Sequence, residues 1–469
     1  MKHLPLLACV FSLIFTCCNN PAQQGDPVKV WITKADQSAL LELQNQDIRF
    51  QPATQDSGIV IKVDTTQKFQ EIDGFGYTVT GGSARMINQM SATAKQKLLQ
   101  ELFGDKDGIQ VSYIRISIGA SDLNDHAFSY DDVPSGQTDL SLSHFSLAPD
   151  MANGTGLIPL LKEIIAIRPG IKILGSPWSP PVWMKDNGNS IGGSLKKEYY
   201  PVYADYFVKY LQAMEAEGVH LDAITIQNEP LHDGNNPSLK MVAEDQRDFV
   251  KNNLGPAFEK AGIKTKIIVY DHNLDKPDYP VTILADTAAA KYVDGSAFHL
   301  YAGDESAMSK VHEAYPNKNL YFTEQWTGSL TPFSKDLLWH TKHVMIGTLR
   351  NWSRIALAWN LASDSAYLPH TPGGCSQCKG ALTITGDEVT RNVAYYTIAH
   401  ASKFIPVGSV RVASNSDGPI HTVAFITPGG GKVLLAMNES KEAVKVDIQF
   451  KGQSIIYTFP AETILTFNW

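Results

Sequence analysis

The sequence predicts an α/β fold, a (β/α)8 TIM barrel, with a side β-sandwich formed from both ends of the chain. Between Lys68 and about residue 402, short apolar runs that end in polar or aromatic residues alternate with amphipathic, helix-like stretches. At both ends of the chain, short β-like runs are separated only by turns, which is typical of antiparallel sheets. Eight strand-and-helix units in the middle region predict a closed parallel barrel.

We expect five segments along the 469 residues. They are a signal at 1–18, a linker at 19–27, the N-terminal strands of the sandwich at 28–66, the barrel at 67–402 and the C-terminal sandwich domain at 403–469. A barrel takes about 250 residues or more, so the middle segment is long enough to form one.

The first segment has a basic start and an apolar stretch from Leu4 to Phe15, too short to cross a bilayer. This pattern is typical of a secretory signal. A polar run follows Cys17 and Cys18 and resembles the tether of a bacterial lipoprotein, in which one of these cysteines carries a lipid anchor. Thr16 departs from the usual small residue before such a cysteine, and the alternative is a cleaved signal without lipid. We expect a location in the cell envelope, as an outer-membrane or periplasmic lipoprotein.

The sandwich is expected from short runs at the two ends of the chain. Val28–Thr33 and Gly58–Val63 are the N-terminal candidates. Ile420–Thr427, Lys432–Asn438 and Val444–Phe450 are the C-terminal ones, separated by glycine-rich turns. We expect the two sets to complete one another.

Between these ends, the predicted barrel strands are Gln70–Tyr77, Val111–Ile118, Ile171–Trp178, Leu221–Pro230, Lys266–Asn273, Asp294–Tyr301, Asn319–Trp326 and Arg354–Leu361. Predicted helices lie between them. One spans Ser91–Phe103 and opens with a capping serine, and another spans Tyr199–Glu217 and stops at Gly218.

Two of these strands end in a glutamate. The run L-D-A-I-T-I-Q-N-E-P places Glu229 at the end of the fourth strand, and N-L-Y-F-T-E-Q-W places Glu324 at the end of the seventh. The carboxyl ends of barrel strands meet at one mouth, so both glutamates face it. A glycosidase needs such a pair, one as proton donor and the other as nucleophile or base. The alternative is two surface glutamates that happen to end strands.

Composition excludes some partners. The net charge is −8, charged residues make up 19% of the chain, and there is no strongly basic patch, so we expect no nucleic acid partner. We expect no cofactor and no metal site. Cys375 and Cys378 lack the second pair of ligands that a zinc site needs.

The order of motifs along the chain resembles glycoside hydrolase family 30, which contains glucosylceramidases and β-1,6-glucanases. The motifs are D-G-F-G (73–76), R-I-S-I-G-A-S-D (115–122), S-P-W-S-P-P-V-W-M-K (176–185), Q-N-E-P, F-H-L-Y, T-E-Q-W and W-N-L. The resemblance covers nearly all of the mature chain. It implies a retaining β-glycosidase with Glu229 as the acid/base and Glu324 as the nucleophile.

The resemblance also suggests which groups bind the sugar. Asp122 suits two hydroxyls of a terminal glucose, and Asn228 suits the 2-hydroxyl. Trp178 and Trp359 offer flat apolar faces, and Trp326 and Trp183 are further candidates. For each tryptophan the alternative is a packing role at the barrel mouth.

Three more residues complete the predicted site. His299 and Tyr301 end the sixth strand, where the family places groups that contact the sugar or the nucleophile. Arg115 projects from the second strand and is expected to hold Glu324 ionised by charge pairing. The negative charge of Glu324 is expected in turn to keep Glu229 protonated.

Cys375 and Cys378 lie in G-G-C-S-Q-C-K-G, on the loop after the eighth strand. In an oxidising compartment we expect a disulfide that stiffens a loop near the substrate, with free thiols as the alternative. This loop resembles the β-1,6-glucanase branch of the family more than the glucosylceramidases.

The predicted function is therefore that of a β-1,6-glucanase. Its expected partner is a β-glucan oligosaccharide or polysaccharide, which it would bind as substrate, and we expect the protein to be a monomer. One alternative is a glucosylceramidase or another β-glycosidase of the same family. A remote alternative is a non-catalytic glycan-binding surface lipoprotein.

Overall fold

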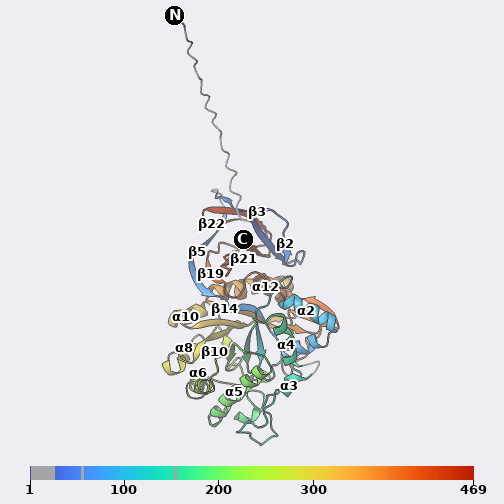
Figure 1. Ribbon diagram of the computed structural model, residues 1–469, viewed down its shortest axis with the longest axis vertical. Helices are drawn as coiled ribbons and strands as arrows, with labels where there is room; N and C mark the ends of the chain where they lie inside the picture. The colour runs from blue at the N-terminus through green and yellow to red at the C-terminus, as the bar shows by residue number, and fades with distance from the viewer. Residues whose placement is uncertain (2–26, 54–57, 153–155) are drawn as a thin grey trace.

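The computed structural model describes residue 1 and residues 27–53, 58–152 and 156–469. Within these residues, eight parallel strands close into a barrel in the order β10-β11-β12-β14-β6-β7-β8-β9, which confirms the predicted fold class (Figure 1). The strands are β6 (Gly74–Thr78), β7 (Tyr113–Ser117), β8 (Lys172–Ser176), β9 (Ala223–Thr225), β10 (Lys266–Asn273), β11 (Val293–His299), β12 (Asn319–Glu324) and β14 (Ser353–Asn360).

The inside of the barrel is filled by side chains from its own strands. These residues form one buried cluster: Tyr113, Leu174, Ala223, Ile268, Ala297, Tyr321, Ile355 and Leu357. Each strand is also covered on its outer face, so most strand positions are buried, and the runs read as continuous apolar stretches. Burial of each large apolar side chain stabilises the fold by roughly 1.5–3 kcal/mol.

Helices follow the strands and cover the barrel. The predicted helix at Ser91–Phe103 is confirmed as α2 (Ala92–Phe103), and the Ser91 hydroxyl caps it by accepting from the Ala94 amide. The predicted helix at Tyr199–Glu217 is confirmed as α5 (Tyr200–Ala216). The other α-helices are α1 (Gly81–Asn88), α3 (Ala148–Met151), α4 (Leu157–Ile167), α6 (Ala243–Phe249), α7 (Gly255–Ala261), α8 (Asp278–Leu284), α9 (Thr287–Ala290), α10 (Ser306–Ala314), α11 (Phe333–Trp339) and α12 (Val393–Ser402).

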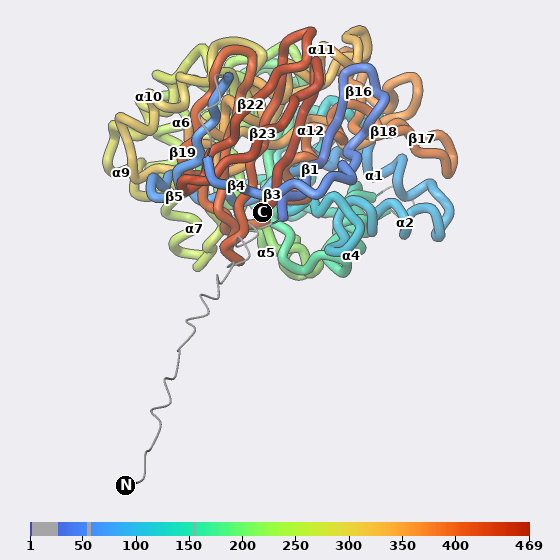
Figure 2. The backbone as a smooth tube through the Cα atoms, turned by 90° about the horizontal axis from the view of Figure 1, so that it is seen from above, coloured from blue at the N-terminus to red at the C-terminus, as the bar shows by residue number. Residues whose placement is uncertain are grey.

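The side sheet combines both ends of the chain, as predicted. Strand β1 (Pro27–Lys34) pairs with the last strand, β24 (Thr463–Asn468), and β5 (Ile59–Glu71) pairs with β19 (Val410–Ser414) and β22 (Val444–Phe450). Figure 2 shows these early and late segments side by side. The remaining strands of this sheet are β2 (Glu42–Leu43), β3 (Ile48–Arg49), β4 (Gln51–Pro52), β20 (Ile420–Ile426), β21 (Lys432–Asn438) and β23 (Gln453–Phe459).

Short strands near the barrel mouth are β13 (Thr327–Gly328), β15 (Ala362–Ser363), β16 (Cys378–Lys379), β17 (Leu382–Thr385) and β18 (Glu388–Arg391).

One expected strand is divided. The run predicted as Gln70–Tyr77 begins inside β5 of the side sheet, and the barrel strand starts only at Gly74. Gly74 has a φ of 147°, and a Cβ at this position would lie 2.6 Å from the Ser112 hydroxyl, so glycine permits the change of direction. The Asp73 carboxylate anchors the turn by pairing with Lys172 and Arg354.

Helix α12 joins the barrel to the side sheet. Its buried His400 contacts the hydroxyls of Thr33 in β1 and Thr466 in β24 through its two ring nitrogens, at 2.8 and 2.9 Å. Burial lowers the pKa of His400 to about 3, so the imidazole is neutral at neutral pH. Next to it, the Trp31 and Phe404 rings pack at 5.4 Å. These contacts fix the sandwich against the barrel.

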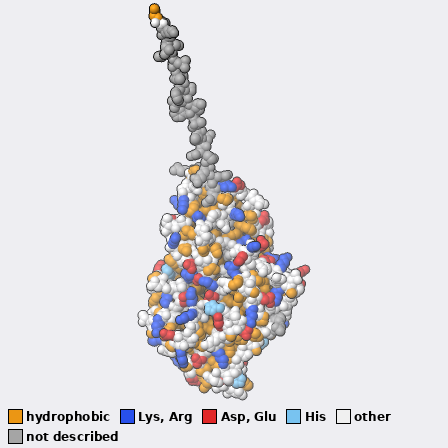
Figure 3. Space-filling view, in the orientation of Figure 1, with side chains coloured by type: hydrophobic (Ala, Val, Ile, Leu, Met, Phe, Trp, Pro, Cys, Tyr) orange, Lys and Arg blue, Asp and Glu red, His pale blue; other side chains and the backbone are white. Residues whose placement is uncertain are grey.

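The predicted signal segment, including Cys17 and Cys18, lies outside the described residues, so the lipoprotein hypothesis stays a prediction. Among the residues that the structure describes, no helix combines the length and apolar character needed to cross a membrane. On the described part of the face in Figure 3, basic and acidic side chains are interspersed.

Candidate active site

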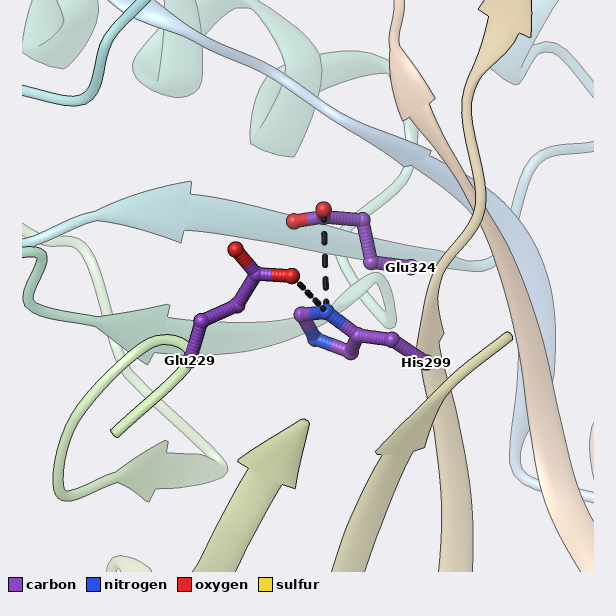
Figure 4. A group of neighbouring side chains, drawn as sticks. All are labelled: Glu229, His299 and Glu324. Atoms are coloured by element: carbon purple, nitrogen blue, oxygen red, sulfur yellow. Dashed lines mark hydrogen bonds and ion pairs between the residues drawn. The ribbon is translucent and has the colours of Figure 1, made fainter. Parts of the chain in front are cut away.

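The two predicted glutamates meet at the carboxyl ends of the barrel strands. Glu324 ends β12, and Glu229 follows β9 across the mouth. One carboxylate oxygen of each glutamate and one ring nitrogen of His299 all lie within 4.8 Å of one another (Figure 4). All three side chains are buried. The structure thus brings together the two carboxyls that sequence placed on separate strands.

Glu324 is held by a cation and a hydroxyl. Arg115 donates to Glu324 Oε2 at 2.5 Å, and the Tyr301 hydroxyl donates to Glu324 Oε1 at 2.9 Å. The same guanidinium donates to Asp271 and to Asn228 Oδ1, each at 2.7 Å. Burial opposes the charge on Arg115, but the carboxylates of Asp271 and Glu324 raise its pKa. The expected pairing of Arg115 with Glu324 is present.

Glu229 has an unusual backbone and two imidazole neighbours. Its φ is 47°, a left-handed conformation that costs energy in a residue with a side chain. Its amide donates to the Asp271 carbonyl at 3.0 Å, which helps to fix this conformation. Its Oε1 lies 3.3 Å from His299 Nδ1 and 3.9 Å from His272 Nε2. Backbone strain of this kind clusters at functional sites.

His299 stands between the two carboxyls. Burial lowers its pKa, but the charge of Glu324 and the hydrogen bonds with Asp271 and Glu229 raise it to about 9. The imidazole is therefore protonated at neutral pH, with Nε2 3.1 Å from Asp271 Oδ1 and Nδ1 3.7 Å from Glu324 Oε1. A protonated ring has no free lone pair for a metal ion.

His299 also changes the expected protonation of Glu229. Burial raises the pKa of Glu229, but the hydrogen bond and the charge of His299 bring it below its ordinary value. Burial raises the pKa of the neighbouring Glu324, although the charges of His299 and Arg115 oppose this. These two directions are the reverse of the expectation that Glu324 is held ionised and keeps Glu229 protonated.

A cavity of about 290 Å³ opens above these groups. Its lining contains most of the predicted site and several residues that were not predicted. The lining residues are Asp122, Trp178, Asn228, Glu229, His232, Asn235, His272, Asn273, Tyr301, Glu324, Trp326, Trp359, Cys375 and Cys378. Arg115 and His299 do not line the cavity and support it from below. Trp183 lies elsewhere and donates to the Asp131 carbonyl at 3.0 Å.

The two central tryptophans contact one another as well as the cavity. The Trp178 and Trp359 rings stack at 5.3 Å, and the Arg115 guanidinium lies 4.8 Å from the centre of the Trp178 ring. Only 1% of Trp178 and 4% of Trp359 is exposed. Both rings line the cavity, and their mutual stacking covers much of the Trp178 face.

Asp122 is held by the loop that carries the cysteines. Cys375 and Cys378 form a disulfide, and the Cys375 amide donates to Asp122 Oδ2 at 3.2 Å. The Thr371 amide donates to the Asp122 carbonyl at 2.9 Å, and Asn236 donates to the loop at the Pro372 carbonyl. Burial and the charge of Glu324 raise the pKa of Asp122 to about 7. The loop thus fixes a carboxyl at the cavity wall.

Sequence reasoning missed five polar residues of the site. Asp271, His272 and Asn273 end β10, the strand-end position that revealed the glutamates, but a D-H-N ending carries no specific motif. His232 and Asn235 lie in the polar loop after Glu229, where side chains of this kind are common. Only the closed barrel shows that these two segments share one cavity.

Comparison with known proteins identifies the family. Residues 72–405 match the glycosyl hydrolase family 30 TIM-barrel domain, and residues 408–467 match the family 30 beta sandwich domain. The endo-1,6-beta-D-glucanase of Neurospora crassa is 37% identical over 405 residues, which cover 82% of this chain and 82% of that protein.

Two further comparisons have similar coverage. The lysosomal acid glucosylceramidase of Mus musculus is 31% identical over 88% of this chain and 84% of its own length. The solved structure of an endo-beta1,6-glucanase superposes with a TM-score of 0.87 at 34% identity, covering 94% of this chain and 99% of that one. The resemblance seen in the motifs is confirmed, and the chain belongs to glycosyl hydrolase family 30.

Proposed function

We propose that this chain is a retaining β-1,6-glucanase with Glu324 as nucleophile and Glu229 as acid/base. The observation that carries the mechanism is the separation of the two carboxyls, whose nearest oxygens lie within 4.8 Å. Retaining enzymes have carboxyl groups about 5–5.5 Å apart, whereas inverting enzymes need about 6.5–9.5 Å to admit a water. A separation this short favours the retaining arrangement.

The reaction proceeds in two displacements. In the first, a Glu324 oxygen bonds to the anomeric carbon, the glycosidic bond breaks, and Glu229 gives a proton to the leaving oxygen. In the second, Glu229 removes a proton from water, the water oxygen bonds to the anomeric carbon, and Glu324 leaves. Arg115 and Tyr301 hold Glu324 in position for both steps.

His299 adjoins the acid/base, with its Nδ1 3.3 Å from Glu229 Oε1. The raised pKa of His299 favours the imidazolium, and Asp271, 3.1 Å from its Nε2, keeps the ring oriented. His299 therefore helps to position the Glu229 side chain.

Two observations support β-1,6-glucan as the substrate. The relatives of similar length include proteins named as endo-1,6-beta-glucanases. The cavity is also small, at the lower end of the ~300–1,000 Å³ typical of ligand pockets. Because each β-1,6 linkage has an extra rotatable bond, its chain curves and suits a short pocket more than a long flat cleft.

A substrate screen tests this proposal. Purified protein is incubated with β-1,6-, β-1,3- and β-1,4-glucans and with glucosylceramide, and reducing ends or ceramide are quantified. We expect kcat/KM on β-1,6-glucan to exceed that on every other substrate by at least about tenfold. If the protein cleaves glucosylceramide rapidly and does not cleave β-1,6-glucan, the substrate assignment is wrong. If it binds glucan without hydrolysing any substrate, the assignment as an enzyme is wrong.

The disulfide loop gives a second prediction. Replacing Cys375 and Cys378 together by alanine removes the restraint on the Cys375 amide that holds Asp122, so KM for β-1,6-glucan should rise by roughly 3- to 10-fold. Ser376→Ala lies on the same loop, keeps the bridge and serves as the matched control. In mass spectra, the parent loop peptide should be two hydrogens lighter before reduction. An unchanged KM in the double variant rejects this role for the loop.

The cellular location also remains a proposal. The basic start, the apolar stretch and the cysteines before a polar run support export to the cell envelope with a lipid anchor. Intact mass of the protein from its own cells tests this, because a lipidated N-terminal cysteine adds the mass of its acyl chains.

A further inference from the structure

Three loops that follow barrel strands contribute to the lining of the cavity. They are the β8 loop (177–196), the β9 loop (226–242) and the disulfide loop (369–380). Trp178 comes from the first loop, Glu229 from the second and Cys375 from the third. Contacts between these loops therefore affect the shape of the site.

Lys185 joins the β8 loop to the β9 loop. Only 1% of this residue is exposed, although an unpaired lysine is almost never fully buried. Within the β8 loop, its ammonium donates to Ser179 Oγ at 3.1 Å and to the Ser190 carbonyl at 3.0 Å. It also donates to the Ser238 carbonyl of the β9 loop at 2.7 Å. The Ser238 amide donates to the Ser190 carbonyl at 2.9 Å, so the two loops are fixed to one another.

The buried ammonium of Lys185 is costly for the fold. Its three acceptors are one hydroxyl and two carbonyls, and none of them carries a charge to balance it. Burial lowers the pKa of Lys185 to about 7, and the nearby charge of Asp186 opposes this shift. An ammonium has three N–H donors, one for each acceptor, whereas a neutral amine has two. The three acceptors therefore favour the charged form.

Asn236 extends this link to the disulfide loop. Its Oδ1 accepts from the Ser190 hydroxyl at 2.8 Å, and its Nδ2 donates to the Pro372 carbonyl at 3.0 Å. The Asn236 carbonyl accepts from the Thr371 hydroxyl at 2.5 Å. The Thr371 amide donates to the Asp122 carbonyl at 2.9 Å. A continuous chain of contacts thus runs from the β8 loop to Asp122.

We propose that Lys185 and Asn236 are positioning residues that hold Asp122 in its place at the cavity wall. This inference rests on the proposed function, because Asp122 must contact the glucan for its position to matter. Asp122 lines the cavity, whereas Lys185 and Asn236 lie outside its lining, so these two residues act through the loops.

The two catalytic glutamates are held by other contacts. The Glu229 amide donates to the Asp271 carbonyl at 3.0 Å, and Arg115 and Tyr301 donate to Glu324. Loss of the link between the loops should therefore raise KM more than it lowers kcat.

A set of double variants tests whether both residues act through Asp122. Lys185→Met keeps the apolar stem of the side chain and removes the ammonium, and Lys185→Gln is a milder second variant that keeps a donor. Asn236→Ala removes both side-chain hydrogen bonds of a half-buried residue. Each change is made alone and together with Asp122→Asn. Lys310→Met, at an exposed position on α10, is the matched control.

The variants are compared by kcat and KM on β-1,6-glucan and by melting temperature. We expect Lys185→Met and Asn236→Ala each to raise KM by about 3- to 10-fold, with kcat within about twofold of the unaltered protein. Combined with Asp122→Asn, either change should lower kcat/KM by less than about twofold further, because residues that act through one another are not additive. Lys185→Gln should raise KM less than Lys185→Met, and Lys310→Met should leave it unchanged.

Three results overturn the inference and leave the proposed function standing. They are an unchanged KM in the folded single variants, a full further loss in the Asp122→Asn background, and an unchanged KM for Asp122→Asn itself. If the unaltered protein does not cleave β-1,6-glucan, the proposed function is wrong and the inference fails with it.

Discussion

Replacing Glu324 with glutamine is expected to reduce hydrolysis of β-1,6-glucan by on the order of 10⁴-fold or more. The amide keeps the shape of the side chain but cannot bond to the anomeric carbon as a carboxylate does. The fold should remain, because Arg115 retains Asp271 at 2.7 Å as a charge partner. Activity is measured as release of reducing ends, and folding as the melting temperature.

Glu313→Gln provides the matched control, because Glu313 is exposed on α10 and the same change of charge is made there. This variant should retain full activity. If the Glu324→Gln variant retains substantial turnover and its melting temperature is unchanged, Glu324 is not the nucleophile.

Glu229→Ala should affect two substrates differently. With β-1,6-glucan, the leaving alkoxide needs a proton, and the loss should be about 10²–10⁴-fold. With an aryl glucoside whose leaving group needs little protonation, formation of the glycosyl ester should be much less impaired. The second step still lacks its base, so ester accumulates and turnover stays slow.

Added azide distinguishes this explanation from general damage. Azide attacks the anomeric carbon without a base, Glu324 leaves, and the product is β-glucosyl azide. Rescue of aryl glucoside turnover with this product is the expected result. Equal losses on both substrates, with no rescue by azide, rule out Glu229 as the proton donor.

The strand ends explain why much of the site could be predicted. Each barrel strand is covered on both faces, so its sequence is an apolar run, and the polar and aromatic residues that end the run mark the mouth. Glu229 and Glu324 stand at such positions, and so do Asn228 and Tyr301. A side sheet built from both ends of the chain was also predictable, because turns and not helices separate the short β-like runs there. The pairing of β1 with β24 within this sheet was not predicted.

Other features depend on contacts that sequence does not encode locally. Asp271 has no motif, yet it contacts Arg115 and His299 and thereby fixes the charges on both. His299, which lies 70 positions away in the chain, brings the pKa of Glu229 below its ordinary value. The strand boundary at Gly74 was missed because the end of β5, the two residues after it and β6 together form one strand-like run in the sequence.

Covalent trapping tests the two-step mechanism most directly. A 2-deoxy-2-fluoro-β-glucoside with a good leaving group reacts with the nucleophile, and the fluorine slows the second displacement, so the glycosyl ester accumulates. The protein is then digested and the labelled peptide is sequenced by mass spectrometry. We expect one fluoroglucosyl group on Glu324 and none on the Glu324→Gln variant. A label on Glu229, or no label together with release of the α-anomer as the first product of glucan cleavage, contradicts the mechanism.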